Sequence, residues 1–379
     1  MRAQNHSIIS NATDGQPRVS EGFFPLRVAE VVPQTREAVA VSFDVPPELR
    51  ERFRFTQGQY VTLRADVGGE EIRRSYSICS GVGDGPLRVG IKRVHDGRFS
   101  TWAHDALVPG ATVDVAPPEG RFFVPLDPAR RRNYLGFAAG SGVTPLLSII
   151  GTTLTTEPHS RFTLVYGNRA TSTVMFRDEL LDLKDRYLER LSLVFVMSRE
   201  SAEIELFSGR IDRAKCEALC DAWIDVAAVD AAFICGPEAM SLEVREALVA
   251  RGLNAADVKV ELFAASGSRE PRPVSARSDA SGHIAASVVI DGRERTFSIA
   301  QDETVLEAGL RAGIELPYSC KGGVCATCRA VLVEGEVDMN RNFALEDYEV
   351  RRGFILMCQS IPATQAVRID VDRAAHALA

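Results

Sequence analysis

The chain has 379 residues, 45% of them hydrophobic, and a formal net charge of −7. This length exceeds what one hydrophobic core usually serves, so we expect two or three domains. No apolar run approaches the ~20 residues of a membrane helix, and no Lys/Arg block is interleaved with aromatic residues, so neither a membrane nor a nucleic acid is an expected partner.

Residues 1–22 are predicted to form a disordered leader. They are polar and lack the charged start, apolar middle and small-residue cleavage site of a secretory signal. We therefore expect a cytoplasmic protein. Because disulfides rarely persist in that compartment, clustered cysteines in this chain are expected to hold a metal or a redox centre.

The segment 23–127 contains many short runs in which apolar and polar residues alternate. Examples are PLRVAEVV, QYVTLRA and LRVGIKRV, with Gly or Pro between them. Alternation with a period of two indicates strands that are half-buried, and many short strands separated by turns predict an antiparallel β-barrel or sandwich.

The segment 128–266 has a different pattern. Its near-continuous apolar runs YLGFAAG, FTLVYGN, LSLVFVMS and AAFICG are separated by helical stretches. Apolar strands alternating with helices predict a doubly wound α/β domain with a parallel sheet. Residues 267–282 are polar, contain Pro and Gly and have no periodicity, which predicts a linker.

The segment 283–379 is predicted to be a third domain. We expect a hairpin that turns at Asp291-Gly292, a short helix over residues 303–314 and a closing strand over residues 367–372.

Four of the eight cysteines have the spacing of an iron–sulfur site. Cys320, Cys325 and Cys328 follow the pattern C-x4-C-x2-C, and Cys358 comes after a gap of 29 residues. This is the plant-type spacing for a [2Fe-2S] cluster. Gly322-Gly323 would let the backbone approach the sulfurs closely. A structural zinc site is the alternative, but zinc modules usually present two close ligand pairs, so the spacing favours two irons.

Two other cysteines, Cys216 and Cys220, lie four residues apart on an expected helix. This spacing could bind a metal, but no His and no third thiol is near, so we expect them to be small core residues.

The segments PYSCKGGVCATC, VEGEVDM, NFALEDYEV and GFILMCQS resemble the ferredoxin domain of the reductase subunits of phenylacetyl-CoA epoxidases. The resemblance covers nearly all of the chain beyond the leader. It implies a β-grasp ferredoxin domain in which the metal ligands are Cys320, Cys325, Cys328 and Cys358.

A flavin site is indicated by Arg74-Ser75-Tyr76-Ser77, which combines a cation, an aromatic ring and hydroxyls. In the run from Lys92 to Trp102, a glycine turn leads into a helix that Ser100 is expected to cap, and its free N–H groups would face a diphosphate. Together with Pro118–Phe122, these segments resemble the FAD domain of the ferredoxin-NADP reductase superfamily.

That resemblance implies a role for each matching residue. Arg74 contacts an FAD phosphate, Tyr76 packs on the isoalloxazine, and the catalytic Ser77 addresses the flavin N5 region. Gly97 and Ser100 lie at the pyrophosphate. Arg73 is either a second phosphate contact or a surface residue.

A nicotinamide site is indicated by two turns. The run from Gly136 to Leu146 passes from a strand through glycines into a helix, and Cys235-Gly236-Pro237 follows the last long strand. The superfamily's nicotinamide domain has both elements. The resemblance implies that Cys235 is catalytic beside the nicotinamide C4, the alternative being an inert buried thiol. It places these residues at the cofactor: Gly140, Gly142, Thr144, Gly236 and Pro237.

The choice of nicotinamide cofactor is predicted from two loops that follow apolar strands. Arg169 follows one strand, and Ser198 and Arg199 follow the next. Cations and hydroxyls at this edge suit a 2′-phosphate, so NADPH is favoured over NADH. Phe263 is expected near the flavin face.

These resemblances together imply a reductase. Electrons from NADPH would pass through FAD and the [2Fe-2S] cluster to a di-iron oxygenase component of a multisubunit complex, the phenylacetyl-CoA epoxidase of phenylacetate degradation. Two alternatives are the reductase of another oxygenase, such as a steroid or aromatic hydroxylase, and a redox-sensing module without catalysis.

Overall fold

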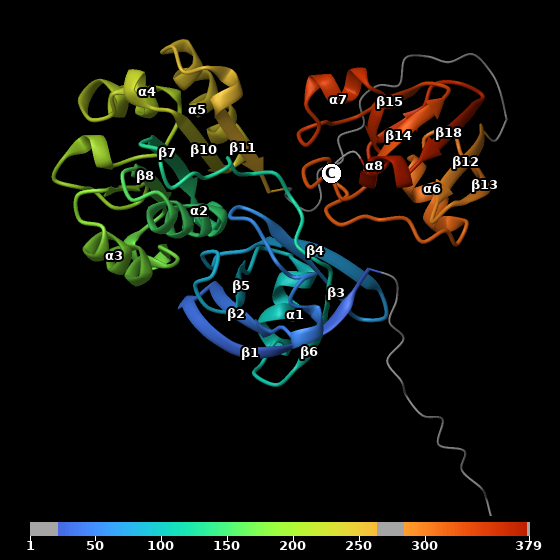
Figure 1. Cartoon of the computed structure of the whole chain (residues 1–379), viewed down its shortest axis with the longest axis horizontal. Coiled ribbons are helices and arrows are strands. Elements are labelled where there is room, and N and C mark those ends of the chain that lie inside the picture. Colours follow the sequence, from blue (N-terminus) through green and yellow to red (C-terminus); the bar gives the residue numbers. More distant parts are fainter. Residues whose placement is uncertain (1–21, 264–283, 377–379) are drawn as a thin grey trace, which may run out of the picture.

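The computed structural model describes residues 22–263 and 284–376, which form three domains (Figure 1). The predicted leader, except for Gly22, and the predicted linker 267–282 lie outside the described residues. Among the helices of the described ranges, none is long and apolar enough to span a membrane.

The first domain is an antiparallel barrel. Its strands are ordered β4-β3-β6-β1-β2-β5, and a bridge between Ile78 and Val89 joins the two ends of this order. The alternating residues point inward to a core that includes Leu26, Val41 and Leu63. This confirms the predicted barrel. Its elements are β1 (Phe24–Thr35), β2 (Ala38–Asp44), β3 (Tyr60–Asp66), β4 (Glu71–Ser77), β5 (Leu87–Lys92), α1 (Arg98–Ala106) and β6 (Thr112–Val115).

The second domain is a parallel sheet with helices on both faces. Its strands are β7 (Asn133–Ala139), β8 (Arg161–Asn168), β9 (Leu191–Met197), β10 (Ala231–Gly236) and β11 (Val258–Leu262), in the order β11-β10-β7-β8-β9. One face packs on α2 (Val143–Thr156) and α3 (Arg177–Arg186), and the other on α4 (Arg213–Ala222) and α5 (Glu238–Ala250).

This arrangement confirms the predicted doubly wound fold. The strand order reverses between β7 and β10, and ligands bind at such a switch point in open α/β sheets. Cys216 and Cys220 of α4 are buried in the core on that face of the sheet, so their expected structural role is confirmed.

The third domain has a five-stranded mixed sheet of β-grasp type. The order is β13-β12-β18-β14-β16, with the first and last long strands, β12 and β18, parallel to each other. Its elements are β12 (Ile284–Ile290), β13 (Arg293–Ile299), α6 (Val305–Arg311), β14 (Arg329–Glu334), β15 (Val337–Met339), α7 (Asp347–Arg351), β16 (Phe354–Leu356), β17 (Ser360–Pro362), β18 (Ala366–Asp370) and α8 (Asp372–His376).

The predicted hairpin lies between β12 and β13. Asp291 and Gly292 have φ values of 52° and 69°, as a two-residue turn with both central residues in the left-handed region requires. Their N–H groups donate to the carboxylate of Asp372 over 2.9 and 2.8 Å. The predicted short helix and closing strand are present as α6 and β18.

The first two domains share an apolar core, whereas the third has a core of its own. Ala38 and Phe122 of the barrel region pack in one cluster with Leu146, Phe176 and Phe233 of the second domain. The buried cluster of the third domain is made only of residues of that domain.

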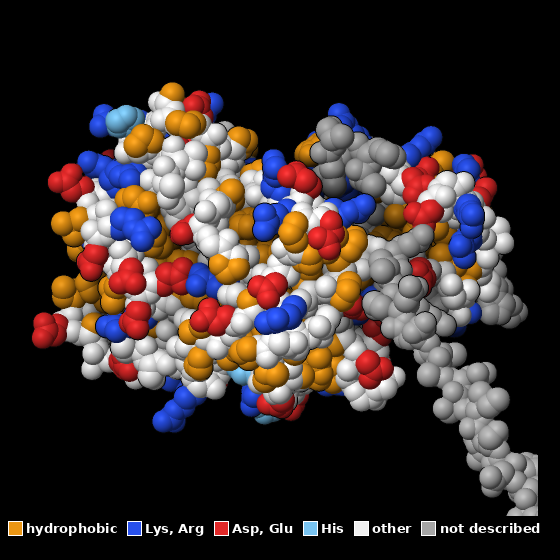
Figure 2. Space-filling model, turned by 60° about the horizontal axis from the view of Figure 1, so that its bottom comes forward, with side chains coloured by type: hydrophobic (Ala, Val, Ile, Leu, Met, Phe, Trp, Pro, Cys, Tyr) orange, Lys and Arg blue, Asp and Glu red, His pale blue; other side chains and the backbone are white. Residues whose placement is uncertain are grey.

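On the face shown in Figure 2, basic and acidic side chains are interspersed.

Candidate functional site

A pocket lies where all three domains meet. It is lined by the barrel, by the end of β11 and by residues 318–328 of the third domain, hereafter the cysteine loop. The lining residues are Tyr60, Arg74, Ser75, Ser77, Glu261, Leu262, Phe263, Cys320, Val324 and Cys325. The structure thus brings together residues that the sequence assigned separately to flavin binding and to the iron–sulfur site.

Strand β4 carries the predicted flavin motif. The guanidinium of Arg74 donates to the carbonyl oxygen of Arg73 over 2.7 Å and lines the pocket. Ser77 is buried, and its hydroxyl donates to the carboxylate of Glu261 over 3.2 Å. Tyr76 does not line this pocket. Its ring packs 6.0 Å from that of Phe99 in α1, and burial raises the pKa of its phenol.

The start of α1 differs from the prediction. The helix begins at Arg98 with Gly97 as its N-cap, so the expectation that Ser100 caps it is wrong. The Ser100 hydroxyl instead accepts from the N–H of Val94 over 3.2 Å and donates to the carbonyl of Gly97 over 3.1 Å. These bonds tie the turn before the helix to its first turn.

A side chain at position 97 would clash with its neighbours in this turn. A Cβ there would lie 2.3 Å from the Val94 side chain, which no real contact permits. The placement of Gly97 and Ser100 at a pyrophosphate stays a prediction.

Arg73 contacts the third domain. It forms an ion pair with Glu71 at 2.7 Å, and its guanidinium lies 4.4 Å from the ring centre of Tyr318. The Arg73 side chain is 15% exposed and joins two domains through a cation–π contact, while its role at a phosphate stays a prediction.

Glu261 is a site residue that sequence reasoning missed. The segment Glu261-Leu262-Phe263 drew attention only for Phe263, which is 41% exposed in the pocket wall. Burial raises the pKa of Glu261 to about 8, although the hydrogen bond from Ser77 acts in the opposite direction. A carboxylate at the carboxyl end of a parallel strand was the available signal.

The switch point brings the two predicted nicotinamide turns into contact. A Cβ on Gly142 would lie 2.0 Å from the carbonyl oxygen of Cys235, and one on Gly236 would lie 3.2 Å from the backbone nitrogen of Ala139. Gly140 has a φ of +54° and its carbonyl accepts from the Tyr166 hydroxyl over 2.8 Å. Glycine is therefore needed where the ends of β7 and β10 approach each other.

The remaining residues of these turns lie close by. Pro237 immediately precedes α5, and the Thr144 hydroxyl donates to the carbonyl of Ser141 over 2.9 Å. The Cys235 side chain is 0% exposed, and burial, followed by the Glu261 charge, raises the pKa of its thiol. Cys235 is thus an uncharged thiol enclosed at the switch point.

The predicted nucleotide edge is formed by the loops after β8 and β9. These loops run side by side, because the N–H of Ser198 donates to Asn168 and the N–H of Arg199 donates to Arg169, each over 2.8 Å. The Arg169 guanidinium is paired with Glu37. Arg199 is exposed, and its side chain has no partner among the described residues.

The four predicted metal ligands form two thiol pairs. Cys320 is hydrogen-bonded to Cys325, and Cys328 to Cys358. Across the two described ranges, no three side chains of the His, Cys, Asp or Glu type converge on a single metal position. The four thiols thus match the four-cysteine ligand set of a [2Fe-2S] cluster.

The loop also supplies donors to the sulfurs. The N–H of Gly322 donates to the Cys320 sulfur over 3.3 Å, and the Gln359 amide donates to the Cys358 sulfur over 3.4 Å. Gly323 has a φ of +78°, which folds the loop over the cysteines. Four thiols with hydrogen-bond donors around them fit a [2Fe-2S] cluster.

Three family models match consecutive parts of the chain. They are the oxidoreductase FAD-binding domain over residues 25–124, the oxidoreductase NAD-binding domain over 137–246, and the 2Fe-2S iron-sulfur cluster binding domain over 288–363. The fold and the site therefore define an NAD(P)H-dependent oxidoreductase that binds FAD and a [2Fe-2S] cluster and acts as an electron-transfer component.

Relatives match more than nine tenths of the chain. A subunit of the 1,2-phenylacetyl-CoA epoxidase of Escherichia coli (strain K12) is 44% identical over 92% of this chain and 98% of its own length. The 3-ketosteroid-9-alpha-monooxygenase, ferredoxin reductase component, of Rhodococcus rhodochrous is 33% identical over 91% and 96%. This chain belongs to the family of oxygenase reductases that includes both, which confirms the predicted family and enzyme class.

A solved structure shows the same fold. Phthalate dioxygenase reductase superposes with a TM-score of 0.59 at 24% identity, covering 92% of this chain and 98% of that one.

Proposed function

We propose that this chain is the NADPH-dependent reductase of a phenylacetyl-CoA epoxidase and supplies electrons to its di-iron oxygenase component. One NADPH and two oxidised acceptor centres would give NADP+, a proton and two singly reduced centres. The observation that carries the proposal is the pocket shared by Arg74, Ser77 and Cys320. The 44% identity to a component of the Escherichia coli epoxidase supports this choice of oxygenase.

When bound, FAD and the cluster supply the conversion of a hydride into single electrons. On the barrel, Arg74 would bind an FAD phosphate, Tyr76 would pack against the isoalloxazine and Ser77 would orient the N5 region. The turn with Gly97 and Ser100 would hold the pyrophosphate.

The second domain binds the nicotinamide cofactor at the switch point. The backbone contacts come from Gly140, Gly142, Thr144, Gly236 and Pro237. Cys235 and Phe263 bound the space in which nicotinamide and flavin meet. The third domain holds the cluster through Cys320, Cys325, Cys328 and Cys358.

We assign these roles to domains that span residues 23–127, 128–266 and 283–379. A cytoplasmic location goes with them too, since a site of four thiolates favours a reducing compartment.

NADPH is the proposed cofactor because Arg199 offers a cation at the nucleotide edge. Arg169 is less suited to a 2′-phosphate, because Glu37 already neutralises it. We expect Arg199→Ala to raise the KM for NADPH about tenfold, as the loss of one charge-assisted contact implies, and to leave the KM for NADH nearly unchanged. An equal rise for both cofactors would remove Arg199 from the 2′-phosphate site.

An anaerobic titration with NADPH, and separately with NADH, tests the reductase itself. Visible spectra follow the flavin and low-temperature EPR follows the cluster. Flavin bleaching together with a rhombic reduced [2Fe-2S] signal is expected, at lower NADPH than NADH. Bleaching without a cluster signal would remove the cluster from the electron path, and no bleaching would favour a redox-sensing module.

The second candidate acceptor is a steroid hydroxylase, which the 33% identity to a 3-ketosteroid-9-alpha-monooxygenase component supports. Reconstitution with purified oxygenase components separates the two candidates. The epoxidase should turn over phenylacetyl-CoA with this reductase at a higher rate than the hydroxylase turns over its steroid. The reverse order would overturn the proposed acceptor.

A further inference from the structure

The contacts between the barrel and the third domain are polar. The Tyr60 hydroxyl bonds to the carbonyl of Cys325 and lies 3.1 Å from the hydroxyl of Thr327. The hydroxyls of Ser75 and Ser319 lie 2.7 Å apart. These bonds hold the cysteine loop over the pocket that Arg74 and Ser77 line.

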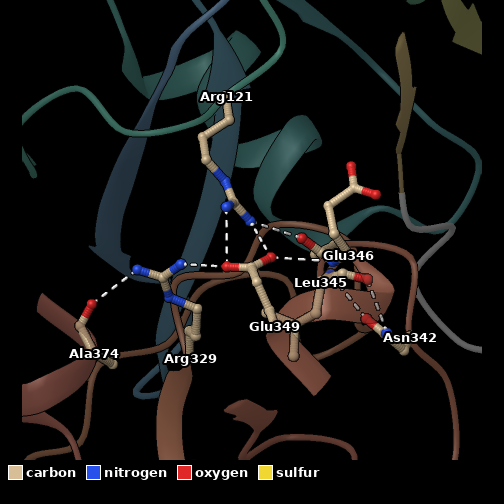
Figure 3. A network of polar contacts seen from close by, with 8 residues as sticks. Arg121, Arg329, Asn342, Leu345, Glu346, Glu349 and Ala374 are labelled. Atoms are coloured by element: carbon tan, nitrogen blue, oxygen red, sulfur yellow. Dashed lines mark hydrogen bonds and ion pairs between the residues drawn. The ribbon is translucent and has the colours of Figure 1, made fainter. Parts of the chain in front are cut away.

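A buried carboxylate joins the same two domains (Figure 3). Glu349 of α7 accepts two hydrogen bonds of 2.9 Å from the guanidinium of Arg121 in the barrel region, one on each oxygen. Arg121 also donates to the carbonyl of Ala344 over 3.1 Å. This two-pronged geometry fixes direction as well as distance.

Glu349 has a second arginine within its own domain. Arg329 of β14 donates to the same carboxylate over 2.7 Å, and the Arg329 and Glu349 side chains are 7% and 4% exposed. Arg121 is 37% exposed. If Arg121 withdraws, Glu349 therefore remains paired, and no buried charge is left without a partner. The Arg121–Glu349 contact can open at a modest cost.

The Arg121–Glu349 contact helps to determine which side of the cysteine loop faces the flavin pocket. Cys320 and Cys325 form part of the pocket wall, so the docked third domain presents its cysteine loop to the flavin site and not to solvent on that side. A partner protein that needs the same face of the loop must wait until the domain leaves.

We infer that Arg121 and Glu349 are positioning residues that dock the cysteine loop reversibly on the flavin pocket. The docked form serves electron entry to the third domain, and the released form presents the loop to the acceptor. This inference rests on the proposed function, because it assigns a direction of electron flow between the two domains.

Hydrogen–deuterium exchange of the full-length holoprotein tests the docking without using activity. In Arg121→Gln, the amides of residues 318–328 should exchange about three- to tenfold faster, the range expected for loss of a partly exposed pair with good geometry. The matched control is Arg27→Gln, which removes an exposed barrel arginine paired with Asp44 at 3.7 Å. The control should leave exchange in 318–328 unchanged.

Stopped-flow reduction by NADPH gives the second readout. Flavin bleaching should keep its rate in Arg121→Gln, while transfer from flavin to cluster slows about three- to tenfold. Added salt should slow this transfer in the wild type but not in Arg121→Gln, because the charge pair is already absent. The transfer rate of Arg121→Lys should lie between those of the wild type and Arg121→Gln, because lysine restores the charge but not the bidentate geometry of the guanidinium.

Unchanged exchange in 318–328, or a transfer rate and salt dependence equal to those of Arg27→Gln, would overturn the inference. So would a rate for Arg121→Lys no better than that of Arg121→Gln. These outcomes leave the proposed function standing as long as NADPH still bleaches the flavin and reduces the cluster. If the wild type fails in those two steps, the proposed function fails first.

Discussion

The barrel shares a buried apolar core with the second domain, besides ion pairs such as Arg88–Glu179, but meets the third domain through polar contacts. Phe122 enters the apolar core shared with the second domain, 5.5 Å from the ring of Phe233, whereas the adjacent Arg121 reaches across to Glu349 of the third domain. Apolar burial is large and insensitive to salt, while exposed charge pairs are weaker and screened. The first two domains are thus built as one body, and the third is attached to it by contacts that can be released.

The largest expected effect is that of Cys328→Ser, which should separate flavin reduction in the first two domains from electron delivery by the third. The cluster site lies wholly within the third domain, which has its own core, so its loss should not disturb the shared core. We expect electron delivery to the oxygenase to be abolished, while ferricyanide reduction at the flavin continues.

Iron content, EPR and the two activities measure this outcome. Cys220→Ser is the control, because that thiol lies in the core of the second domain and is not expected to ligate iron. A normal [2Fe-2S] signal in Cys328→Ser would contradict the ligand assignment.

A disulfide across the polar interface should convert a releasable contact into a permanent one. The Ser75 and Ser319 hydroxyl oxygens are 2.7 Å apart, which brings cysteine sulfurs at the two positions within bonding reach. In oxidised Ser75→Cys/Ser319→Cys, flavin-to-cluster transfer should persist, while delivery to the oxygenase falls more than about tenfold, since closure holds the cysteine loop on the pocket.

Stopped-flow rates before and after treatment with a thiol reductant test this prediction, with Ser75→Cys alone as the control. Full delivery by the crosslinked protein would mean that the acceptor uses another face of the third domain.

The two interfaces also differ in how far the sequence predicted them. Strand and helix patterns are local, so QYVTLRA predicted β3, and cysteine spacing predicted the cluster ligands. The contacts that join the domains are not local. Ser77 and Glu261 are 184 residues apart, and Arg121 and Glu349 are 228 apart. Nothing in the sequence around Glu261 or Glu349 shows which distant group will face the carboxylate.

The wrong prediction for Ser100 has a related cause. A serine at the start of a helix commonly caps it. Here the turn from Val94 to Gly97 takes both hydrogen bonds of the hydroxyl, and Gly97 occupies the cap.

Phe122→Ala should contrast with Arg121→Gln in stability. Removing a buried phenylalanine costs about 3–5 kcal/mol, and this loss should lower the unfolding midpoints of the first two domains together. Arg121→Gln should change the free energy of unfolding by less than about 1 kcal/mol, because its pair is partly exposed. Calorimetry of both variants provides the measurement, and a separate transition for the barrel alone in Phe122→Ala would argue against a single body.

The last prediction concerns the pH dependence of stability, through Glu261, whose carboxyl group lies at the junction of the first two domains. Burial raises its pKa from 4.5 to about 8 in the folded protein. Between these two pH values the unfolded chain has released a proton that the folded chain keeps, so this group makes the free energy of unfolding fall as the pH rises. Below pH 4.5 the carboxyl is protonated in both states, and its contribution is fully present.

Glu261→Gln removes the titrating proton and keeps the acceptor for Ser77. The cofactor-free variant should therefore lose less stability than the wild type between pH 5 and pH 8, a window set by the raised pKa of Glu261 at about 8. Unfolding midpoints measured across this range test the prediction, with the exposed Glu48→Gln as the control that keeps the wild-type slope. If stability changed with pH equally in all three proteins, Glu261 would be ionised in the folded state over this range. The junction of the first two domains would then contain a charged carboxylate, as the interface with the third domain does at Glu349.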